Sequence, residues 1–385
     1  MTTTSIPLAP SEPPWSAVST EELATTPIGL YVHVPFCQRR CGYCAFTTEA
    51  LTDPTSPQSL ARVEQYVTAA VAEVHASADA IGASVPPMTS VFVGGGTPTM
   101  LAPADLGRIL DSVTTSFDTS PDLEVTVESN PDSLAPDQLA AMAALGVTRV
   151  SFGMQSVRRS VLALLDRTHD PQRALDAVGE ARAAGIRHVS LDLIYGTPGE
   201  REQDWSDTLD AVLGTEVDHV SAYALGIESG TKLAARVRSG ELPTPDDDQA
   251  ADRYLLADER LSAAGFEWYE ISNWARDPTA RCRHNQLYWR NHHWWGIGPG
   301  AHSHLAGTRW WNRRDTAAWA TGVHVGDGSQ VEDHEHLDAE ERRLEDLMLG
   351  IRLAEGLELP GGRRLVLTPR GRLLADTVVQ RLTAT

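Results

Sequence analysis

The chain has 385 residues, 42 % of them apolar, so it can bury a large core in about two domains or in one barrel with an appendage. Its formal charge of −20 argues against sequence-independent binding to nucleic acid, because such binding depends on neutralising phosphates. No apolar run approaches the roughly 20 residues that cross a bilayer, and the N-terminus lacks the pattern of a signal peptide. We therefore expect a cytoplasmic protein with no transmembrane segment.

Short apolar runs alternate with amphipathic stretches between residue 28 and about residue 230. The alternation predicts helices at 60–81, 106–117, 137–145 and 171–184, with Asp170 at a helix start and Gly146 and Gly185 just after helix ends. The predicted strands are 29–34, 90–93, 123–128, 147–152, 188–194 and 219–225. Strands that alternate with helices form a parallel sheet, and six units are too few for an eight-stranded barrel. We expect an α/β fold, an open partial (β/α)6 barrel.

The rest of the chain differs in composition, so we expect four segments. Residues 1–27 are predicted to form a flexible tail and residues 28–230 the barrel core. Tryptophan and histidine are dense between residues 268 and 311, which suggests that residues 231–320 close the open side of the barrel. A charged helix is expected at 338–352, within a small, mainly helical C-terminal domain at 321–385.

Three of the four cysteines, Cys37, Cys41 and Cys44, lie within eight residues. Clustered thiols argue against a disulfide scaffold and for a reducing compartment. Thiolates suit iron–sulfur clusters, zinc or copper(I), and three of them can hold three irons of a four-iron cluster while the fourth iron stays open. A structural zinc site is the alternative, and it would need a fourth ligand from Cys282 or a distant histidine. The spacing C-x3-C-x2-C resembles the signature of the radical S-adenosylmethionine (SAM) superfamily, in which SAM binds the open iron.

Polar residues follow several of the predicted strands, where ligands of parallel α/β folds gather. The turn Gly94-Gly95-Gly96-Thr97 lets backbone approach a ligand closely, although a simple tight turn would also explain it. Glu128, Gln155 and Asp192 end other strands, where each could equally be a structural residue inside the barrel. Together they line one mouth, where acidic groups suit the ribose hydroxyls of SAM and a nearby arginine suits its carboxylate.

Four motifs in this order resemble the oxygen-independent coproporphyrinogen III oxidase family of radical SAM proteins, from about residue 28 to about residue 355. They are Tyr-Val-His-Val-Pro-Phe at 31–36, the Gly-Gly-Gly-Thr-Pro-Thr turn, Ser-Phe-Gly-Met-Gln-Ser at 151–156 and Asp-Leu-Ile-Tyr-Gly-Thr-Pro-Gly at 192–199. The resemblance implies a [4Fe–4S] cluster on Cys37, Cys41 and Cys44, and SAM as a further cofactor. It also implies SAM contacts from Tyr31, Tyr43, Gly95, Gly96, Thr97, Glu128, Gln155, Arg167, Asp192 and Ala224.

Two branches of this family differ near the cluster. The oxidases resemble one another in having a fourth cysteine two residues after the third. This chain has Phe46 at that position. The resemblance therefore argues against catalytic oxidase activity, and no catalytic residue is assigned. Residues 284–289, His-Asn-Gln-Leu-Tyr-Trp, match the H-N-x-x-Y-W signature of the HemW-type branch, which is regarded as a heme chaperone. That resemblance implies heme binding and delivery of heme to acceptor proteins such as respiratory enzymes.

The same segment suggests where heme binds. A heme site needs an axial donor and an aromatic slot, and His284, Tyr288 and Trp289 are the residues we expect there. An aromatic core that closes the barrel, with His284 hydrogen-bonded inside it, is the alternative. The rival axial ligands are His292, His293, His302 and His304.

Three hypotheses follow from the sequence. The first is a cytoplasmic heme chaperone with a [4Fe–4S] cluster and SAM. The second is an authentic oxidase that decarboxylates coproporphyrinogen III to protoporphyrinogen IX. The third is a zinc-stabilised interaction protein. Only ten residues separate Gly356 from Leu367, so the C-terminal domain looks shorter than in the family, and its role in docking partners stays open.

Overall fold

The computed structural model describes residues 12–82, 85–359 and 361–383, and twelve strands in this part of the chain form one sheet. Six parallel strands occupy the middle of the sheet in chain order. They are β1 (Ile28–Val34), β4 (Met88–Gly95), β5 (Thr119–Ser129), β6 (Arg149–Gln155), β7 (His188–Tyr195) and β8 (His219–Ala224). All six overlap the predicted strands, so the predicted partial (β/α)6 barrel is confirmed.

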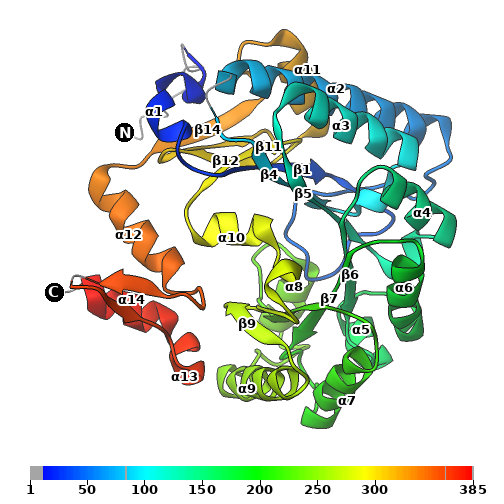
Figure 1. Ribbon diagram of the computed structural model, residues 1–385. Helices are drawn as coiled ribbons and strands as arrows, with labels where there is room; N and C mark the ends of the chain where they lie inside the picture. Colours follow the sequence, from blue (N-terminus) through cyan, green and yellow to red (C-terminus); the bar gives the residue numbers. More distant parts are fainter. Residues whose placement is uncertain (1–11, 83–84, 360, 384–385) are drawn as a thin grey trace, which may run out of the picture.

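Helices cover the outer face of this curved sheet (Figure 1). Successive side chains of a strand point to opposite faces of the sheet, and Leu30, Val32 and Val34 of β1 are fully buried. Asp170 caps a helix by accepting from the backbone of Gln172 at 3.0 Å, as its position predicted. The outer helices are α2 (Pro57–Ile81), α3 (Pro103–Ser116), α4 (Pro136–Ala144), α5 (Arg159–Leu164), α6 (Pro171–Ala183) and α7 (Glu202–Leu213).

The segment 231–320 adds strands to both edges of the sheet. On the β8 side, after α8 (Lys232–Arg238) and α9 (Asp247–Ala263), come β10 (Asn273–Ala275) and β9 (Glu267–Glu270). On the β1 side, β11 (His293–Ile297) pairs parallel with β1, and β12 (His302–Leu305) and β13 (Thr308–Asn312) follow antiparallel, with β14 (Val331–His336) at the edge. Between these strands, α10 (Arg283–Trp289) packs against β1 and β4 from inside the barrel (Figure 1).

One buried carboxylate joins the barrel to this antiparallel extension. Glu73 of α2 is 2 % exposed. It accepts hydrogen bonds from the backbone of Gly298 at 2.8 Å, from Asn312 Nδ2 at 2.8 Å and from Trp319 Nε1 at 3.0 Å. These donors come from the loop after β11, from β13 and from α11 (Thr316–Val325). A buried charge is costly unless it is hydrogen-bonded, so Glu73 favours this one arrangement of four elements.

The N-terminal segment expected to be a tail lies only partly within the described residues. Residues 1–11 lie outside them. Pro14–Ala17 and Thr20–Leu23 form the short helices η1 and α1. The Trp15 ring packs 5.0 Å from the Trp295 ring and 5.5 Å from the Trp310 ring. Since an indole buries a large apolar area, this contact ties the segment to the extension of the sheet.

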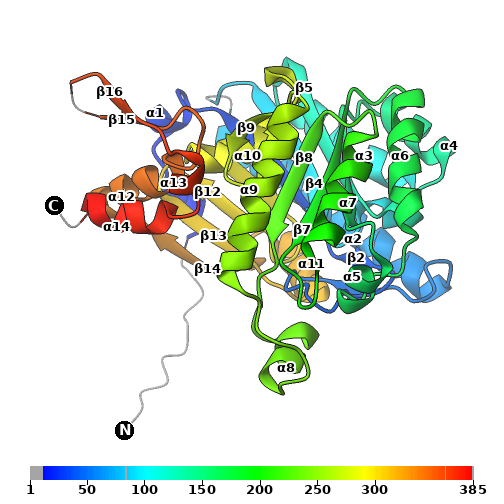
Figure 2. The same ribbon diagram turned by 90° about the horizontal axis from the view of Figure 1, so that it is seen from below.

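The C-terminal part is mainly helical, as predicted, but β14, inside the expected domain of residues 321–385, belongs to the large sheet. The C-terminal part contains α12 (Ala339–Gly350), the hairpin β15 (Leu357–Leu359) and β16 (Arg363–Leu365), α13 (Pro369–Arg372) and α14 (Ala375–Thr383). Ile351, Leu367, Ala375 and Val379 form a small core of their own. Figure 2 shows these helices gathered at one end of the molecule, beside the antiparallel strands. No helix in the described part of the chain is both long and apolar enough to cross a membrane.

Stability near Glu73 is expected to depend on pH. Burial raises the pKa of this carboxyl from 4.5 to about 7. Between those values the folded state keeps a proton that the unfolded state releases, so the contribution of Glu73 to stability falls as pH rises through this window. Glu73→Gln removes the titration. We expect the free energy of unfolding of the wild type, relative to the variant, to fall by on the order of 3 kcal/mol between pH 4.5 and 7.5, measured by urea unfolding.

Glu259→Gln, at an exposed position of α9, is the matched control for the loss of one carboxylate. If the free energies of unfolding of the wild type and Glu73→Gln differ by the same amount at every pH in this range, the raised pKa of Glu73 is contradicted.

Candidate functional site

The loop that carries the three clustered cysteines follows β2 (Phe36–Cys37) and lies at the carboxyl end of the barrel. Its cysteines are free thiols, with Cys37 buried and the other two half-buried. The backbone N–H of Gly42 donates to the carbonyl of Leu165 at 3.3 Å, and the N–H of Leu233 donates to the carbonyl of Gly42 at 2.8 Å. A Cβ at Gly42 would lie 2.6 Å from Asp166 Oδ2, so a larger residue there would displace the Asp166 side chain.

The three cysteines line a cavity of about 150 Å³, here called the cluster cavity. The structure gathers eight of the ten expected SAM contacts around it: Tyr43, Gly95, Gly96, Thr97, Glu128, Gln155, Arg167 and Asp192. Ala224 lines a larger cavity next to it. Tyr31 lines neither cavity, and its hydroxyl lies 3.0 Å from His33 Nδ1 instead. The residue types around the cluster cavity are those expected for SAM, and their role stays a prediction.

The glycine-rich turn after β4 sits directly against the cysteine loop. The N–H of Gly96 donates to the carbonyl of Val34 at 2.8 Å, and the N–H of Thr97 donates to the carbonyl of Phe36 at 2.7 Å. A Cβ at Gly96 would lie 2.6 Å from that Phe36 oxygen and 3.0 Å from Cys37 Sγ. Thr97 Oγ1 lies 3.8 Å from the same sulfur. The turn therefore needs glycine to approach the cysteine loop, beyond what a simple tight turn requires.

Arg167 connects the cysteine loop to the ends of two strands. Its guanidinium donates to Cys41 Sγ at 3.5 Å, to Gln155 Oε1 at 2.9 Å and to Asn130 Oδ1 at 2.8 Å. Asn130 also donates to Thr97 Oγ1 at 3.1 Å, so it orients two residues of the cavity. Asn130 was not predicted, although its position just after a strand end and two residues from Glu128 was a signal for it.

Two carboxyl groups face each other across the strand ends. Glu128 Oε2 accepts from the N–H of Gly95 at 3.1 Å, and both oxygens of Asp192 lie 2.8 Å from Ser151 Oγ. Burial, with a smaller effect of Asp192, raises the pKa of Glu128 to about 8. Burial also raises the pKa of Asp192. Such carboxyl groups can exchange hydrogen bonds with the hydroxyl groups of a bound nucleoside. Ser151 was not predicted, because a serine inside a strand carries no sequence signal.

The cysteines themselves fit a metal cluster. Burial raises the pKa of Cys37 to about 11 and also raises the pKa of Cys44, so these thiolates need a nearby cation. Among the described residues, no three His, Cys, Asp or Glu side chains converge on a point that suits a single metal ion. A closed zinc site requires such convergence, whereas each thiolate of a four-iron cluster binds a different iron. The three cysteines of this loop could supply one thiolate to each of three irons.

The larger cavity, of about 710 Å³, continues from the cluster cavity into the barrel and is here called the lumen cavity. Tyr43, Glu128 and Asp192 line both. Phe46, at the position of the fourth cysteine of the oxidases, is 65 % exposed and also lines both cavities. A phenyl ring there presents an apolar surface beside the cysteine loop and supplies no thiolate.

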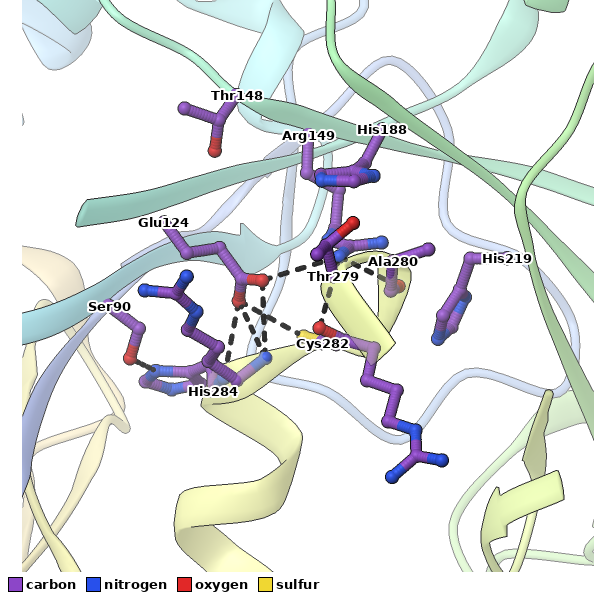
Figure 3. A network of polar contacts seen from close by, with 12 residues as sticks. Ser90, Glu124, Thr148, Arg149, His188, His219, Thr279, Ala280, Cys282 and His284 are labelled. Atoms are coloured by element: carbon purple, nitrogen blue, oxygen red, sulfur yellow. Dashed lines mark hydrogen bonds and ion pairs between the residues drawn. The ribbon is translucent and has the colours of Figure 1, made fainter. Parts of the chain in front are cut away.

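A buried ion pair holds the floor of the lumen cavity in place (Figure 3). Glu124 of β5 lies 3.3 Å from Arg149 Nη2 and 3.5 Å from Cys282 Sγ. It also accepts from the backbone N–H groups of Arg283 at 2.9 Å and His284 at 3.2 Å, which begin α10. A carboxylate is favoured at a helix N-terminus, so Glu124 fixes where α10 enters the barrel. No sequence signal linked these residues, because they are far apart in the chain.

The residues expected to bind heme lie on α10. His284 is 1 % exposed, and its Nδ1 lies 3.0 Å from Ser90 Oγ while its Nε2 lies 3.1 Å from Tyr288 Oη. Burial lowers the pKa of His284 to about 3. The Tyr288 ring makes an edge contact with the Trp294 ring at 4.5 Å, and Trp289 donates a hydrogen bond to Glu270. The histidine thus faces the interior, with partners on both ring nitrogens.

Comparison with known proteins establishes the family. Residues 31–212 match the model of the Radical SAM superfamily. The chain is 48 % identical over 379 residues to the protein named Heme chaperone HemW of Mycobacterium tuberculosis, covering 92 % of this chain and 95 % of that protein. It belongs to the HemW family. Members from Synechocystis and Bacillus subtilis are 35 % and 30 % identical, covering 91 % and 85 % of this chain and 84 % of each relative.

The HemW family shares its fold with an oxidase. The structure of coproporphyrinogen III oxidase (HemN) from Escherichia coli aligns with a TM-score of 0.79 at 22 % identity, covering 94 % of this chain and 91 % of that one. This likeness concerns the fold alone. Membership of a radical SAM family implies a [4Fe–4S] cluster and SAM, which agrees with the residues around the cluster cavity.

Each clustered cysteine is expected to be necessary for the cluster. After anaerobic reconstitution, the wild type should hold about four irons and four sulfides per chain, and Cys37→Ser, Cys41→Ser or Cys44→Ser should hold few or none. Cys282→Ser is the matched control and should keep the cluster, because Cys282 lies at the floor of the lumen cavity. Metal and sulfide analysis measures both. Zinc without iron or sulfide in the wild type would instead support the structural zinc hypothesis.

A methyl group at Gly96 is expected to disturb the cluster cavity. Gly96→Ala places a Cβ against Phe36 and Cys37, so SAM binding by the reconstituted protein should weaken by about tenfold or more, equal to about 1.4 kcal/mol. Gly179→Ala is the control, because a Cβ at this helical position meets nothing within 4 Å. Isothermal titration with SAM gives the affinities. Unchanged SAM affinity in Gly96→Ala would show that the turn is not part of the site.

Proposed function

We propose that the protein is a heme chaperone that holds a [4Fe–4S] cluster and SAM in the barrel, binds heme and delivers it to acceptor proteins in the cytoplasm. The observation that carries this proposal is the 48 % identity across nearly the whole length of a protein named a heme chaperone. The three free thiols also suit a reducing compartment. Respiratory enzymes are the acceptors that we expect.

The chain supplies a distinct set of groups for each cofactor. Cys37, Cys41 and Cys44 would hold three irons, and the remaining lining of the cluster cavity would hold SAM. When bound, this pair supplies one-electron chemistry. Arg167 places positive charge beside Cys41, and its bonds to Gln155 and Asn130 fix that position. The residues thus hold the cofactors in one place, whether or not SAM is turned over.

Heme delivery is favoured over oxidase activity by the chemistry beside the cysteine loop. Phe46 stands where the oxidases have a fourth cysteine, and its ring is largely exposed at both cavities. The chain therefore has no thiol at the position where an oxidase has one. The likeness to the HemN structure, at 22 % identity, concerns the shared barrel and does not argue for the oxidase reaction.

Anaerobic titration with heme tests the proposal. We expect the reconstituted protein to bind about one heme per chain and to pass it to a heme-free respiratory cytochrome, measured by the absorption of each partner after separation. Cys37→Ser should still bind heme, because we expect the cluster and heme sites to be separate. With coproporphyrinogen III, SAM and a reductant, the protein should form no protoporphyrinogen IX. Absence of stoichiometric heme binding would rule out the chaperone, and formation of protoporphyrinogen IX would support the oxidase.

A further inference from the structure

A second cavity, of about 450 Å³, lies outside the barrel and contains none of the cluster or SAM residues. It is bounded by α10, by strands β11 to β14 and by α12, and is here called the outer groove. Figure 1 shows α12 beside the antiparallel strands and facing α10. The volume lies in the usual range of small-molecule sites. Its lining includes Tyr288, Trp294, His302, Arg309, Trp311 and Met348.

Four flat rings line the outer groove, beside polar, charged and aliphatic side chains. The Tyr288 and Trp294 rings meet edge to face at 4.5 Å. The His302 and Trp311 rings stack with centroids 5.6 Å apart and planes inclined by 24°. Trp294 Nε1 donates to the carbonyl of His302 at 3.1 Å, which holds the two pairs together. Flat aromatic walls favour a planar apolar ligand.

The third wall is a helix whose apolar side chains are not covered. None of the residues of α12 is buried, although an amphipathic helix ordinarily buries its apolar face. Leu344 and Met348 are 39 % and 38 % exposed, and Met348 and Leu349 line the groove. A ligand in the groove would cover part of this surface. Methionine adapts well to such a ligand, because its side chain is flexible and polarizable.

The structure ranks the four rival histidines. His304 uses both ring nitrogens, Nδ1 with the carbonyl of His292 at 3.0 Å and Nε2 with the N–H of Gly307 at 3.1 Å. His293 is buried and does not line the groove, and its Nδ1 accepts from the backbone N–H of Ala306 at 3.4 Å. His292 does not line the groove.

His302 is the histidine left with a free lone pair in the groove. Neither of its ring nitrogens has a hydrogen-bond partner within the described residues, and it lines the groove. An imidazole with a free ring nitrogen can bind a metal ion.

We propose that heme binds in the outer groove, with His302 as an axial ligand of the iron and the Trp294 and Trp311 rings against the macrocycle. The inference rests on the proposed function and assigns the place of the cargo. A histidine is a common axial ligand of heme iron, and an apolar aromatic slot suits the porphyrin. The site is separate from the lumen that holds the cluster residues, so heme and SAM would be bound at the same time.

The charges in the groove set the orientation of the heme. Arg309 pairs with Glu335 at 2.8 Å and with Glu345, so two carboxylates surround one guanidinium. The heme propionates would be repelled by Glu335 and Glu345. The edge of the macrocycle without propionates would therefore enter the groove first. The propionates then remain in solvent, where an acceptor protein can reach them.

The H-N-x-x-Y-W motif acquires a different role in this arrangement. His284 lies inside the barrel and holds the Tyr288 hydroxyl, and the Tyr288 ring supports Trp294 in the groove wall. His284 is thus a positioning residue that acts on heme through Tyr288. A substitution at His284 should weaken heme binding without changing the axial ligand, whereas a substitution at His302 should change the ligand itself.

Magnetic circular dichroism and EPR of the heme-loaded, reconstituted full chain test this assignment, because the two methods report the axial ligand. In His302→Ala we expect the histidine-ligated signal to disappear and heme affinity to fall about tenfold or more, and added imidazole to restore the signal. His302→Tyr should convert the spectrum to that of a phenolate-ligated heme. His284→Gln should bind heme more weakly and keep the histidine-ligated signal. His324→Ala, at an exposed histidine of α11, is the matched control and should leave the spectrum unchanged.

The outcomes separate this inference from the proposed function. A wild type that binds no heme refutes the chaperone proposal and this inference together. A wild type that binds heme while His302→Ala and His302→Tyr keep its spectrum refutes the outer groove alone. Loss of the histidine signal in His284→Gln, with its retention in His302→Ala, would place the iron at α10 instead.

Discussion

The close contact between the glycine-rich turn after β4 and the cysteine loop is the constraint on which the candidate site depends. The N–H of Gly96 donates to the carbonyl of Val34 at 2.8 Å, and there is no room for a Cβ beside Cys37. Only a residue without a side chain fits this position. This contact holds the cysteine loop against the carboxyl end of β4, beside the ends of the neighbouring parallel strands. Arg167 and Asn130 then link the loop to the strands, so the cysteines and eight of the ten expected SAM residues share one cavity.

Buried carboxylates organise the rest of the molecule around that site. Glu73 connects α2 to the antiparallel extension, and Glu124 connects β5 to the start of α10. Each is costly to bury and gains its stability from several donors distant in the chain, so both favour one arrangement over others. Through Glu124, α10 carries His284 into the barrel while Tyr288 faces the outer groove.

This arrangement separates two kinds of chemistry in one chain. The thiols, the arginine and the acidic strand ends surround the barrel lumen, where a charged cofactor can be held away from bulk solvent. The aromatic outer groove lies on the other side of α10, next to a helix with no buried residue. A protein that carries a hydrophobic cargo needs a site from which the cargo can leave, and a groove at the surface provides one.

The sequence by itself determined the six parallel strands, the cysteine loop and most of the residues around the cluster cavity, because these follow from local periodicity and from short motifs at strand ends. It did not determine Ser151 or the Glu124–Arg149 pair, whose partners are far apart in the chain and carry no local pattern. The sequence could not rank the four other histidines against His284 as heme ligands. A histidine can bind iron only through a ring nitrogen that has no other partner, and the sequence does not show which nitrogens have partners. Only the tertiary structure decided this, because packing places His284 and His304 in hydrogen bonds and leaves His302 unpaired beside a cavity.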